Sequence, residues 1–254
     1  MTSLLLLWHA ATLLSGSSVG LLGTYMVGFR MPFLAVAISH AAMAGGVFAY
    51  VLGWPMGPAA LAAALLCGGL VAWMTSSTSH TDMNTLTSIL LSFTMALAFL
   101  GMGLNQGDMT PLLSLMWGSL LLVQLSDVVI ILITFTILIF LMLVFGKELN
   151  ALLFSRTIAR ASGIQERVVM VAFLVTASAL VTVNLQIVGG LMMYSLLTNP
   201  AAAAYEIGRS PGAVRRWAIL FGVISTVGGL WISYIFDLPT GACIVLVSCL
   251  VYAV

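Results

Sequence analysis

The chain has 254 residues, of which 62% are hydrophobic and 6% are charged, and its mean hydropathy is +1.19. Soluble domains contain roughly 45–50% apolar and about 25% charged residues, so this composition excludes an ordinary water-soluble domain. The formal net charge of +1 gives no support for a nucleic-acid partner. The three cysteines lie in apolar segments without CxxC spacing, which predicts small core residues rather than a disulfide or a structural zinc site.

Nine apolar segments, taken in chain order, are candidate membrane spans. A bilayer core about 30 Å thick requires roughly 20 apolar residues of helix. The candidates cover residues 4–28, 33–52, 58–75, 86–104, 126–145, 168–187, 189–207, 217–236 and 239–254. The apolar stretch 111–122 is shorter and indicates a re-entrant or interfacial segment. We therefore expect an all-α polytopic bundle of eight or nine spans, in which residues 1–254 form a single transmembrane domain.

A bend, rather than a loop, separates the sixth and seventh candidate spans. The bend lies near Gly189 and Gly190, so the segment is either two spans or a longer helix followed by a broken one. Pro200 predicts a further break in the seventh span. Proline lacks a backbone N–H and frees a carbonyl about one turn earlier, which can then point into a cavity.

The basic residues give the orientation, because cytoplasmic loops carry an excess of Lys and Arg. If the N-terminus lies outside, every basic residue of the nine-span arrangement falls on the cytoplasmic side. These residues are Arg30, Lys147, Arg156, Arg160, Arg167, Arg209, Arg215 and Arg216. We therefore expect a multi-pass protein with its N-terminus outside and its C-terminus in the cytoplasm.

The longest cytoplasmic connection, residues 146–167, has amphipathic character. It predicts a short helix over about 149–163, in which Arg156 and Arg160 lie one turn apart and Gly163 supplies the helix stop. Such a helix can lie on anionic lipid or dock into a groove on a cytoplasmic partner. The chain has no GxxxxGK(S/T) loop, so we expect that it is not an enzyme and that another subunit hydrolyses any ATP.

Four segments carry a resemblance to a known family. Residues 30–41, RMPFLAVAISHA, are similar to the signature R-M-S-L-x-G-D-A-L-S-H-A, and residues 153–164, LFSRTIARASGI, are similar to F-D-x-x-x-A-x-x-x-G-I. Residues 188–205 and 229–252 are similar to V-G-x-L-L-V-x-A-L-L-I-x-P-A-A-T-A and G-L-x-L-S-Y-x-x-D-x-P-x-G-A-x-I-V-L. Through these segments the chain resembles the membrane permease subunit of ABC-type importers of divalent metals (zinc, manganese or iron).

The resemblance implies a permease of the prokaryotic plasma (inner) membrane, in which two copies of the chain enclose one pathway through the lipid bilayer. Two cytoplasmic ATPase subunits would bind ATP and hold the 149–163 helix, and an extracytoplasmic metal-binding protein would deliver the ion. The divalent metal ion is then the transported substrate, and no cofactor is bound permanently. The residues expected to couple the chain to the ATPase are Phe154, Arg156, Arg160, Gly163 and Ile164.

Two positions depart from the family pattern. Val36 stands where the family has Asp, four residues before His40, and Ser155 stands where the family has an acidic residue after Phe154. The first change removes a carboxylate that could bind a divalent ion together with an imidazole one turn away. Either the metal is also held elsewhere, or the cargo or its handling differs.

Polar side chains within the spans are candidates for the metal pathway, because their burial costs several kcal/mol unless they are paired or hydrated. His40 is the main candidate, either as a ligand or as a neutral imidazole that bonds a backbone carbonyl. Asn184, Gln186 and Asn199 either line the pathway or join helices through hydrogen bonds.

These features favour the permease subunit of an ATP-driven importer of divalent transition metal ions. The alternative is a stand-alone secondary transporter or channel for a small cation, which would be expected to carry more carboxylates within its spans. A third interpretation is a membrane protein for assembly, which would use residues 146–167 only for docking.

Overall fold

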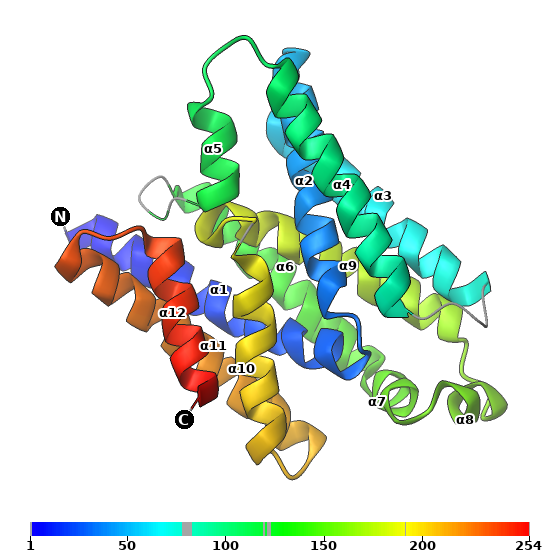
Figure 1. The fold of residues 1–254 in the computed structure, drawn as a ribbon. Helices are drawn as coiled ribbons and strands as arrows, with labels where there is room; N and C mark the ends of the chain where they lie inside the picture. The colour runs from blue at the N-terminus through cyan, green and yellow to red at the C-terminus, as the bar shows by residue number, and fades with distance from the viewer. Residues whose placement is uncertain (1, 78–82, 119, 121–122, 191, 254) are drawn as a thin grey trace.

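The computed structural model describes residues 2–77, 83–118, 120, 123–190 and 192–253. Over these residues the chain is built from α-helices and has no β-strand, which confirms the predicted all-α fold (Figure 1). The helices are α1 (Thr2–Gly28), α2 (Pro32–Val51), α3 (Met56–Ser77), α4 (Met83–Leu104), α5 (Thr110–Trp117), α6 (Leu125–Val144), α7 (Gly146–Phe154), α8 (Arg156–Ala161), α9 (Glu166–Val188), α10 (Met193–Ile207), α11 (Pro211–Phe236) and α12 (Thr240–Ala253).

Among the described residues, seven helices are long and apolar enough to cross a bilayer, namely α1, α2, α3, α4, α6, α9 and α11. They coincide with seven of the nine predicted spans. The other two predicted spans correspond to the shorter helices α10, with 15 residues, and α12, with 14 residues. The short apolar stretch contains the eight-residue helix α5. A multi-pass bundle is confirmed, and the exact number of spans stays a prediction.

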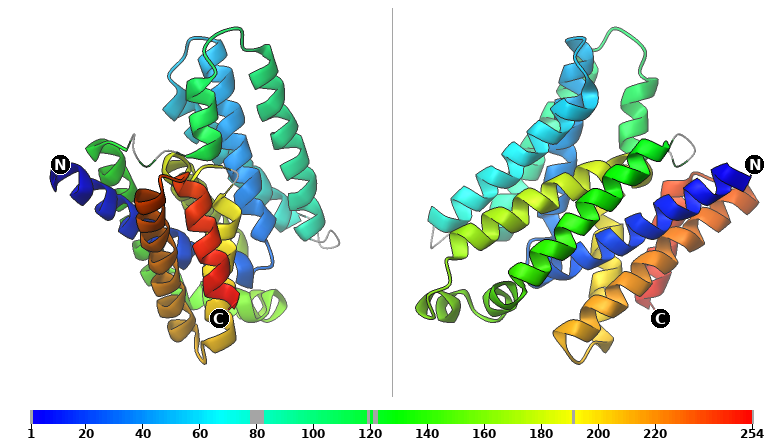
Figure 2. Two further views of the ribbon diagram at one scale, coloured as in Figure 1. Left: turned by 60° about the vertical axis from the view of Figure 1, so that its left-hand side comes forward. Right: turned by 180° about the vertical axis from the view of Figure 1, so that it is seen from behind.

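The helices pack in two groups. In the α2 group, α2 packs against α3 and α4, and α3 packs against α9 (Figures 1 and 2). In the α11 group, α11 packs against α1, α10 and α12. α6 lies between the groups, because it contacts both α1 and α9, and α2 contacts both α9 and α10. Of the spanning helices α2 is the most deeply buried, so its polar side chains face protein rather than lipid.

Small residues allow α1 and α11 to approach closely. A Cβ atom added at Gly16 would lie 2.6 Å from the carbonyl oxygen of Gly222. At the same contact, the hydroxyl of Thr226 donates to the carbonyl oxygen of Thr12 at 2.9 Å. Because lipid supplies no hydrophobic driving force between helices, such close packing and interhelical hydrogen bonds hold membrane bundles together.

The connection between α9 and α10 is a tight bend formed by glycines. Gly189 has φ +86°, a conformation that favours glycine. A Cβ atom at this position would lie 2.6 Å from the carbonyl oxygen of Met116, so the end of α5 packs directly on the bend. The N–H of Gly190 donates to the carbonyl oxygen of Leu115 at 3.1 Å. The non-helical backbone of the bend is therefore satisfied by α5.

The helix break expected at Pro200 does not occur, because α10 continues through this residue. Proline removes one backbone hydrogen bond from a helix interior. Residues 201–204 are four alanines, which are the strongest helix formers. Packing of α10 against α1, α11 and α12 then holds the helix together around the buried proline.

The contact between α1 and α11 leads to a first prediction. A methyl group added by Gly222→Ala would overlap the carbonyl oxygen of Gly16, and we expect it to destabilise the protein by about 2 kcal/mol. Gly212→Ala is the matched control, because Gly212 also lies in α11 and has no atom within 4 Å of an added Cβ. Thermal unfolding in mild detergent should show a lower Tm only for Gly222→Ala. An equal Tm for the two variants would contradict the close contact.

Candidate functional site

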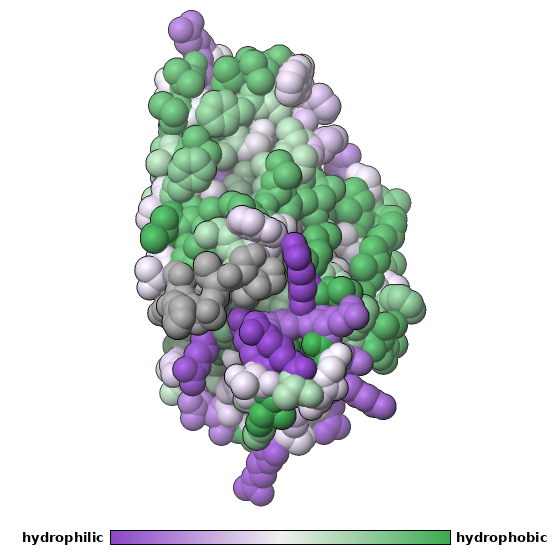
Figure 3. All heavy atoms as spheres, turned by 90° about the vertical axis from the view of Figure 1, so that its right-hand side faces the viewer, coloured by the Kyte–Doolittle hydropathy of each residue, from purple (hydrophilic) through white to green (hydrophobic). Residues whose placement is uncertain are grey.

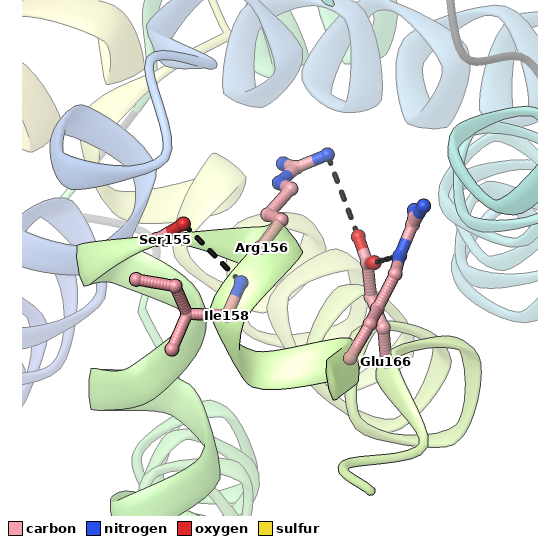
Figure 4. Close-up of polar contacts among 5 residues, drawn as sticks. Ser155, Arg156, Ile158 and Glu166 are labelled. Atoms are coloured by element: carbon pink, nitrogen blue, oxygen red, sulfur yellow. Dashed lines mark hydrogen bonds and ion pairs between the residues drawn. The ribbon is translucent and has the colours of Figure 1, made fainter. Parts of the chain in front are cut away.

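Two short helices, α7 and α8, lie at one end of the bundle, between α6 and α9 (Figure 1). Instead of the single helix expected over about 149–163, the chain forms two helices that meet at Ser155. Ser155 has an extended backbone, and its Oγ accepts a hydrogen bond from the N–H of Ile158 at 3.4 Å (Figure 4). Ser155 is thus the N-cap of α8. Serine and aspartate are both favoured N-caps, so this serine provides the cap that an acidic residue there would also provide.

α8 ends in a glycine-dependent turn. Gly163 has φ +84°, and its N–H donates to the carbonyl oxygen of Arg160 at 3.0 Å. The N–H of Ile164 donates to the carbonyl oxygen of Ala159 at 3.1 Å. This pair of hydrogen bonds is a Schellman motif. It ends α8 after two turns and directs the chain into α9.

Glu166, in the first turn of α9, ties α9 to α8. Its side chain is only 6% exposed, and it accepts a hydrogen bond from Nε of Arg160 and faces Nη1 of Arg156 at 3.6 Å (Figure 4). Burial lowers the pKa of Arg156, and the negative charge of Glu166 opposes that shift. Removal of Glu166 would leave the partly buried guanidinium of Arg156 without an opposite charge, which is destabilising. The two helices therefore move together unless the cluster breaks.

Of the predicted coupling residues, Gly163 and Ile164 form the turn that ends α8. The others divide into an outer set, Phe154 with its neighbour Ile158, and an inner set, Arg156 and Arg160. Phe154 is 84% exposed and Ile158 is 57% exposed, so both present apolar surface outward. Arg156 points inward, with its guanidinium 5.9 Å from the ring centre of Phe29 on the side of α1. Arg160 is half-exposed in its ion pair with Glu166. The outer set offers a contact surface, and the inner set fixes α8 to the bundle.

His40 is the buried ionisable residue of α2, with 2% of its surface exposed. Its Nδ1 lies 2.9 Å from the carbonyl oxygen of Val36. Because a carbonyl oxygen can only accept, Nδ1 carries the proton and Nε2 keeps its lone pair. Nε2 is buried, and no described residue is hydrogen-bonded to it. His40 thus makes the backbone bond of the structural interpretation and also keeps a donor nitrogen free for a ligand.

Asn184 is the second buried polar side chain near the bend. Its Nδ2 donates to the carbonyl oxygen of Leu180 at 2.9 Å, and its buried Oδ1 has no hydrogen-bond partner among the described residues. Gln186 lies two residues further along α9, and its side chain lies outside the described part of the chain. A Cβ atom at Gly190 would lie 2.6 Å from the sulfur of Met43, so the bend touches α2 one turn beyond His40.

Asn199 lies apart from these groups. Its Nδ2 donates to Oγ of Ser248 at 3.0 Å and to Sγ of Cys249 at 3.3 Å, both on α12. Pro200, the next residue, is buried within α10. Asn199 therefore joins α10 to α12. Across the described residues no three His, Cys, Asp or Glu side chains gather into a metal-binding cluster.

Sequence reasoning missed Glu166 as a member of the site, although a signal was present. An acidic residue in the first turn of a helix is stabilised by the helix dipole, and Glu166 follows a glycine stop and two nearby arginines. The Ser155 cap was also missed, because the residues around it continue an amphipathic helical pattern.

The cap of α8 can be tested directly. Ser155→Ala should weaken α8 by about 1 kcal/mol and speed hydrogen exchange of its amides about fivefold, because the N–H of Ile158 loses its acceptor. Ser155→Asp should exchange at close to the wild-type rate. Ser162→Ala is the control, because Ser162 donates to a carbonyl and caps no helix start. Unchanged exchange in Ser155→Ala would contradict the capping role.

Comparisons with known proteins agree over nearly the whole chain. A family profile described as "ABC 3 transport family" matches residues 2–254. The high-affinity zinc uptake system membrane protein ZnuB of Haemophilus influenzae is 26% identical over 91% of this chain and 88% of that protein. The manganese transport system membrane protein MntC of Listeria innocua is 31% identical over 92% of this chain and 82% of that protein.

A solved structure has the same fold. It is described as PsaBC from Streptococcus pneumoniae in complex with Fab, and one of its chains superposes with a TM-score of 0.85 and 25% sequence identity. The superposition covers 98% of this chain and 90% of that chain. The full-length family match and the seven apolar helices agree with a protein of the prokaryotic inner membrane. This chain therefore belongs to the ABC 3 transport family and is a multi-pass membrane permease.

Proposed function

We propose that this chain is the permease subunit of an ATP-driven importer that carries a divalent transition metal ion: zinc, manganese or iron. Family membership and the names of ZnuB and MntC support this proposal. Two copies of the chain, each a single domain over residues 1–254, enclose one pathway. Two cytoplasmic ATPase subunits hydrolyse ATP, and an extracytoplasmic metal-binding protein supplies the ion. The ion is the substrate and is not a permanently bound cofactor.

The observation that supports an ATPase partner is the exposed apolar surface of α7 and α8. Phe154 and Ile158 are exposed at the end of the bundle, beyond the spanning helices. Apolar side chains that water would otherwise surround are typical of a contact site, and a large aromatic residue is a common anchor of protein interfaces. A groove on a cytoplasmic subunit that covers Phe154 and Ile158 accounts for their exposure.

The basic residues support an orientation with the N-terminus outside and the C-terminus in the cytoplasm. Arg156 lies over Phe29, and Nη1 of Arg215 lies 3.4 Å from Oδ1 of Asn150, so the ends of α1, α7, α8 and α11 meet. On the face drawn in Figure 3, most hydrophilic side chains gather toward this end. The remaining basic residues, in the adjoining helix ends and connections, are Arg30, Lys147, Arg160, Arg167, Arg209 and Arg216. By the positive-inside rule this end is cytoplasmic.

The coupling route runs from α8 through Glu166 into α9. An ATPase that moves the exposed surface of α8 also moves the first turn of α9, because the ion pairs join the two helices. α9 ends at the glycine bend, which packs on α2 one turn from His40. A rigid helix can thus connect the coupling surface to the middle of the bundle without any covalent change.

The pathway in this proposal passes His40 and the bend. The free Nε2 of His40 is a donor that suits zinc, iron and manganese, and the Oδ1 of Asn184 is a neutral oxygen donor. Gln186 is proposed as a further pathway residue. Asn199 and Pro200 are proposed to hold α10 in place, and Gly189 and Gly190 to allow the bend to change shape.

The role of His40 predicts a transport defect without a folding defect. His40→Ala should lower metal uptake at least about tenfold, because the pathway loses its nitrogen donor. His9→Ala is the matched control, since the ring of His9 also bonds a backbone carbonyl one turn earlier, at 2.7 Å, but on α1. Uptake of radioactive zinc or manganese by cells with equal amounts of each variant measures the effect. Wild-type uptake by His40→Ala would contradict the proposed role of His40 in the metal pathway.

The ATPase contact can be tested by pull-down. Phe154→Asp should lower recovery of the ATPase with the tagged chain at least about tenfold, because a charge replaces an exposed apolar anchor. Lys147→Asp, on the exposed surface of α7, is the control and should keep the partner. Near one-to-one recovery with Phe154→Asp would contradict the contact. A wild-type chain that transports metal but is recovered alone would instead support the stand-alone transporter.

A further inference from the structure

A cleft opens at the same end of the bundle as α7 and α8. Its volume is about 420 Å³, and it lies between α1, α7, α10 and α11. Two arginines, Arg209 and Arg215, line it, and its lining contains no carboxylate. The residues that line the cleft therefore carry a net positive charge.

Neutral groups hold Arg215 in place. Its Nη1 donates to the hydroxyl oxygen of Tyr25 at 3.0 Å and to Oδ1 of Asn150 at 3.4 Å. Neither partner carries a negative charge, so the guanidinium is positioned but not neutralised. Arg209 is exposed at the rim of the same cleft. Among the described residues, every ion pair involves Glu166, so neither arginine has a carboxylate partner within 4.0 Å.

The cleft also has an apolar side. Leu153, Phe154 and Val214 line it next to the arginines. Trp217, two residues after Arg215 in a spanning helix, is 40% exposed and stacks on Phe221 with ring centres 5.6 Å apart. Arginine and tryptophan together near the end of a span are typical of the membrane interface. A ligand of this cleft thus meets charge and apolar surface at the boundary between lipid and water.

We propose that the cleft binds the phosphate headgroup of an anionic phospholipid from the leaflet on the side of α7 and α8. Arg215 and Arg209 contact the phosphate, and Leu153 and Val214 contact the glycerol end of the lipid. Basic pockets between spanning helices are a known class of headgroup site. The proposal does not depend on the metal cargo. Phe154 lines the cleft and also belongs to the proposed ATPase contact, so lipid retention is measured on the chain without the ATPase, and its outcome is separate from the outcome of the pull-down.

The test uses the full-length chain in nanodiscs made from equal parts of phosphatidylglycerol and phosphatidylcholine. After mild delipidation, the retained lipids are counted by mass spectrometry. Two arginines at a membrane surface should enrich phosphatidylglycerol over phosphatidylcholine by about tenfold. Arg209→Gln and Arg215→Gln should each reduce this enrichment at least about threefold. Arg167→Gln, which removes a charge at the same end but outside the cleft, should leave it unchanged.

If Arg215→Gln fails to fold, Arg209→Gln still tests the proposal, because Arg209 is exposed and lies before the start of α11. Equal retention of the two lipids, or an equal loss in Arg167→Gln, would overturn the proposal. Displacement of phosphatidylglycerol by millimolar inorganic phosphate would identify a free phosphate site instead. Loss of ATPase recovery with unchanged lipid retention in Arg209→Gln would identify a protein contact and would also overturn it.

Discussion

A bilayer core offers no water to the backbone, so every N–H and C=O group within it must find a partner inside the protein. This constraint accounts for the long uninterrupted helices and for the few places where they stop. At the α9–α10 bend, the backbone leaves the helix only where α5 covers it, and the N–H of Gly190 bonds the carbonyl oxygen of Leu115. The short helix α5 therefore supplies a backbone partner that a continuous helix would have supplied itself.

The bend also lies where the two packing groups meet. α9 belongs to the α2 group, whereas α10 belongs to the α11 group and is joined to α12 through Asn199. A displacement that enters at α8 and passes through Glu166 reaches α9 first, because the ion pairs hold α8 against its first turn. α10 is held by different neighbours, so a displacement of one group relative to the other would be taken up at Gly189. Gly189 has φ +86° and no side chain to restrict its backbone. Hinges of this kind absorb a backbone change at few residues and leave the packed helices rigid.

The apolar runs of the sequence suffice to predict the helical fold and the seven long apolar helices, since a run of about 20 apolar residues has few other structures in a membrane. They do not separate α7 from α8, because Ser155 continues the amphipathic pattern and only its extended backbone shows the cap. They also mislead at Pro200, where tertiary packing and the following alanines outweigh the lost hydrogen bond. Contacts between distant residues, such as Arg215 with Tyr25 across 190 positions, leave no trace in a single sequence. The cleft near α11 therefore could not be predicted from the sequence and is seen only in the folded structure.

The valine at position 36 affects how an ion would be held beside His40. The carbonyl oxygen of Val36 accepts a hydrogen bond from Nδ1 of His40, so residue 36 orients the imidazole through its backbone while its side chain offers no ligand. The remaining donors near the bend, Nε2 of His40 and Oδ1 of Asn184, are neutral. A neutral set compensates the charge of a divalent ion less well than a set with a carboxylate, because burial of an ion costs most where no opposite charge is near. In the proposed pathway such a site would bind the ion weakly, which suits transport, because an ion that is to cross must also leave. In the proposed pathway, Val36 in place of an aspartate therefore lowers the affinity for the divalent ion and lets the ion leave more readily.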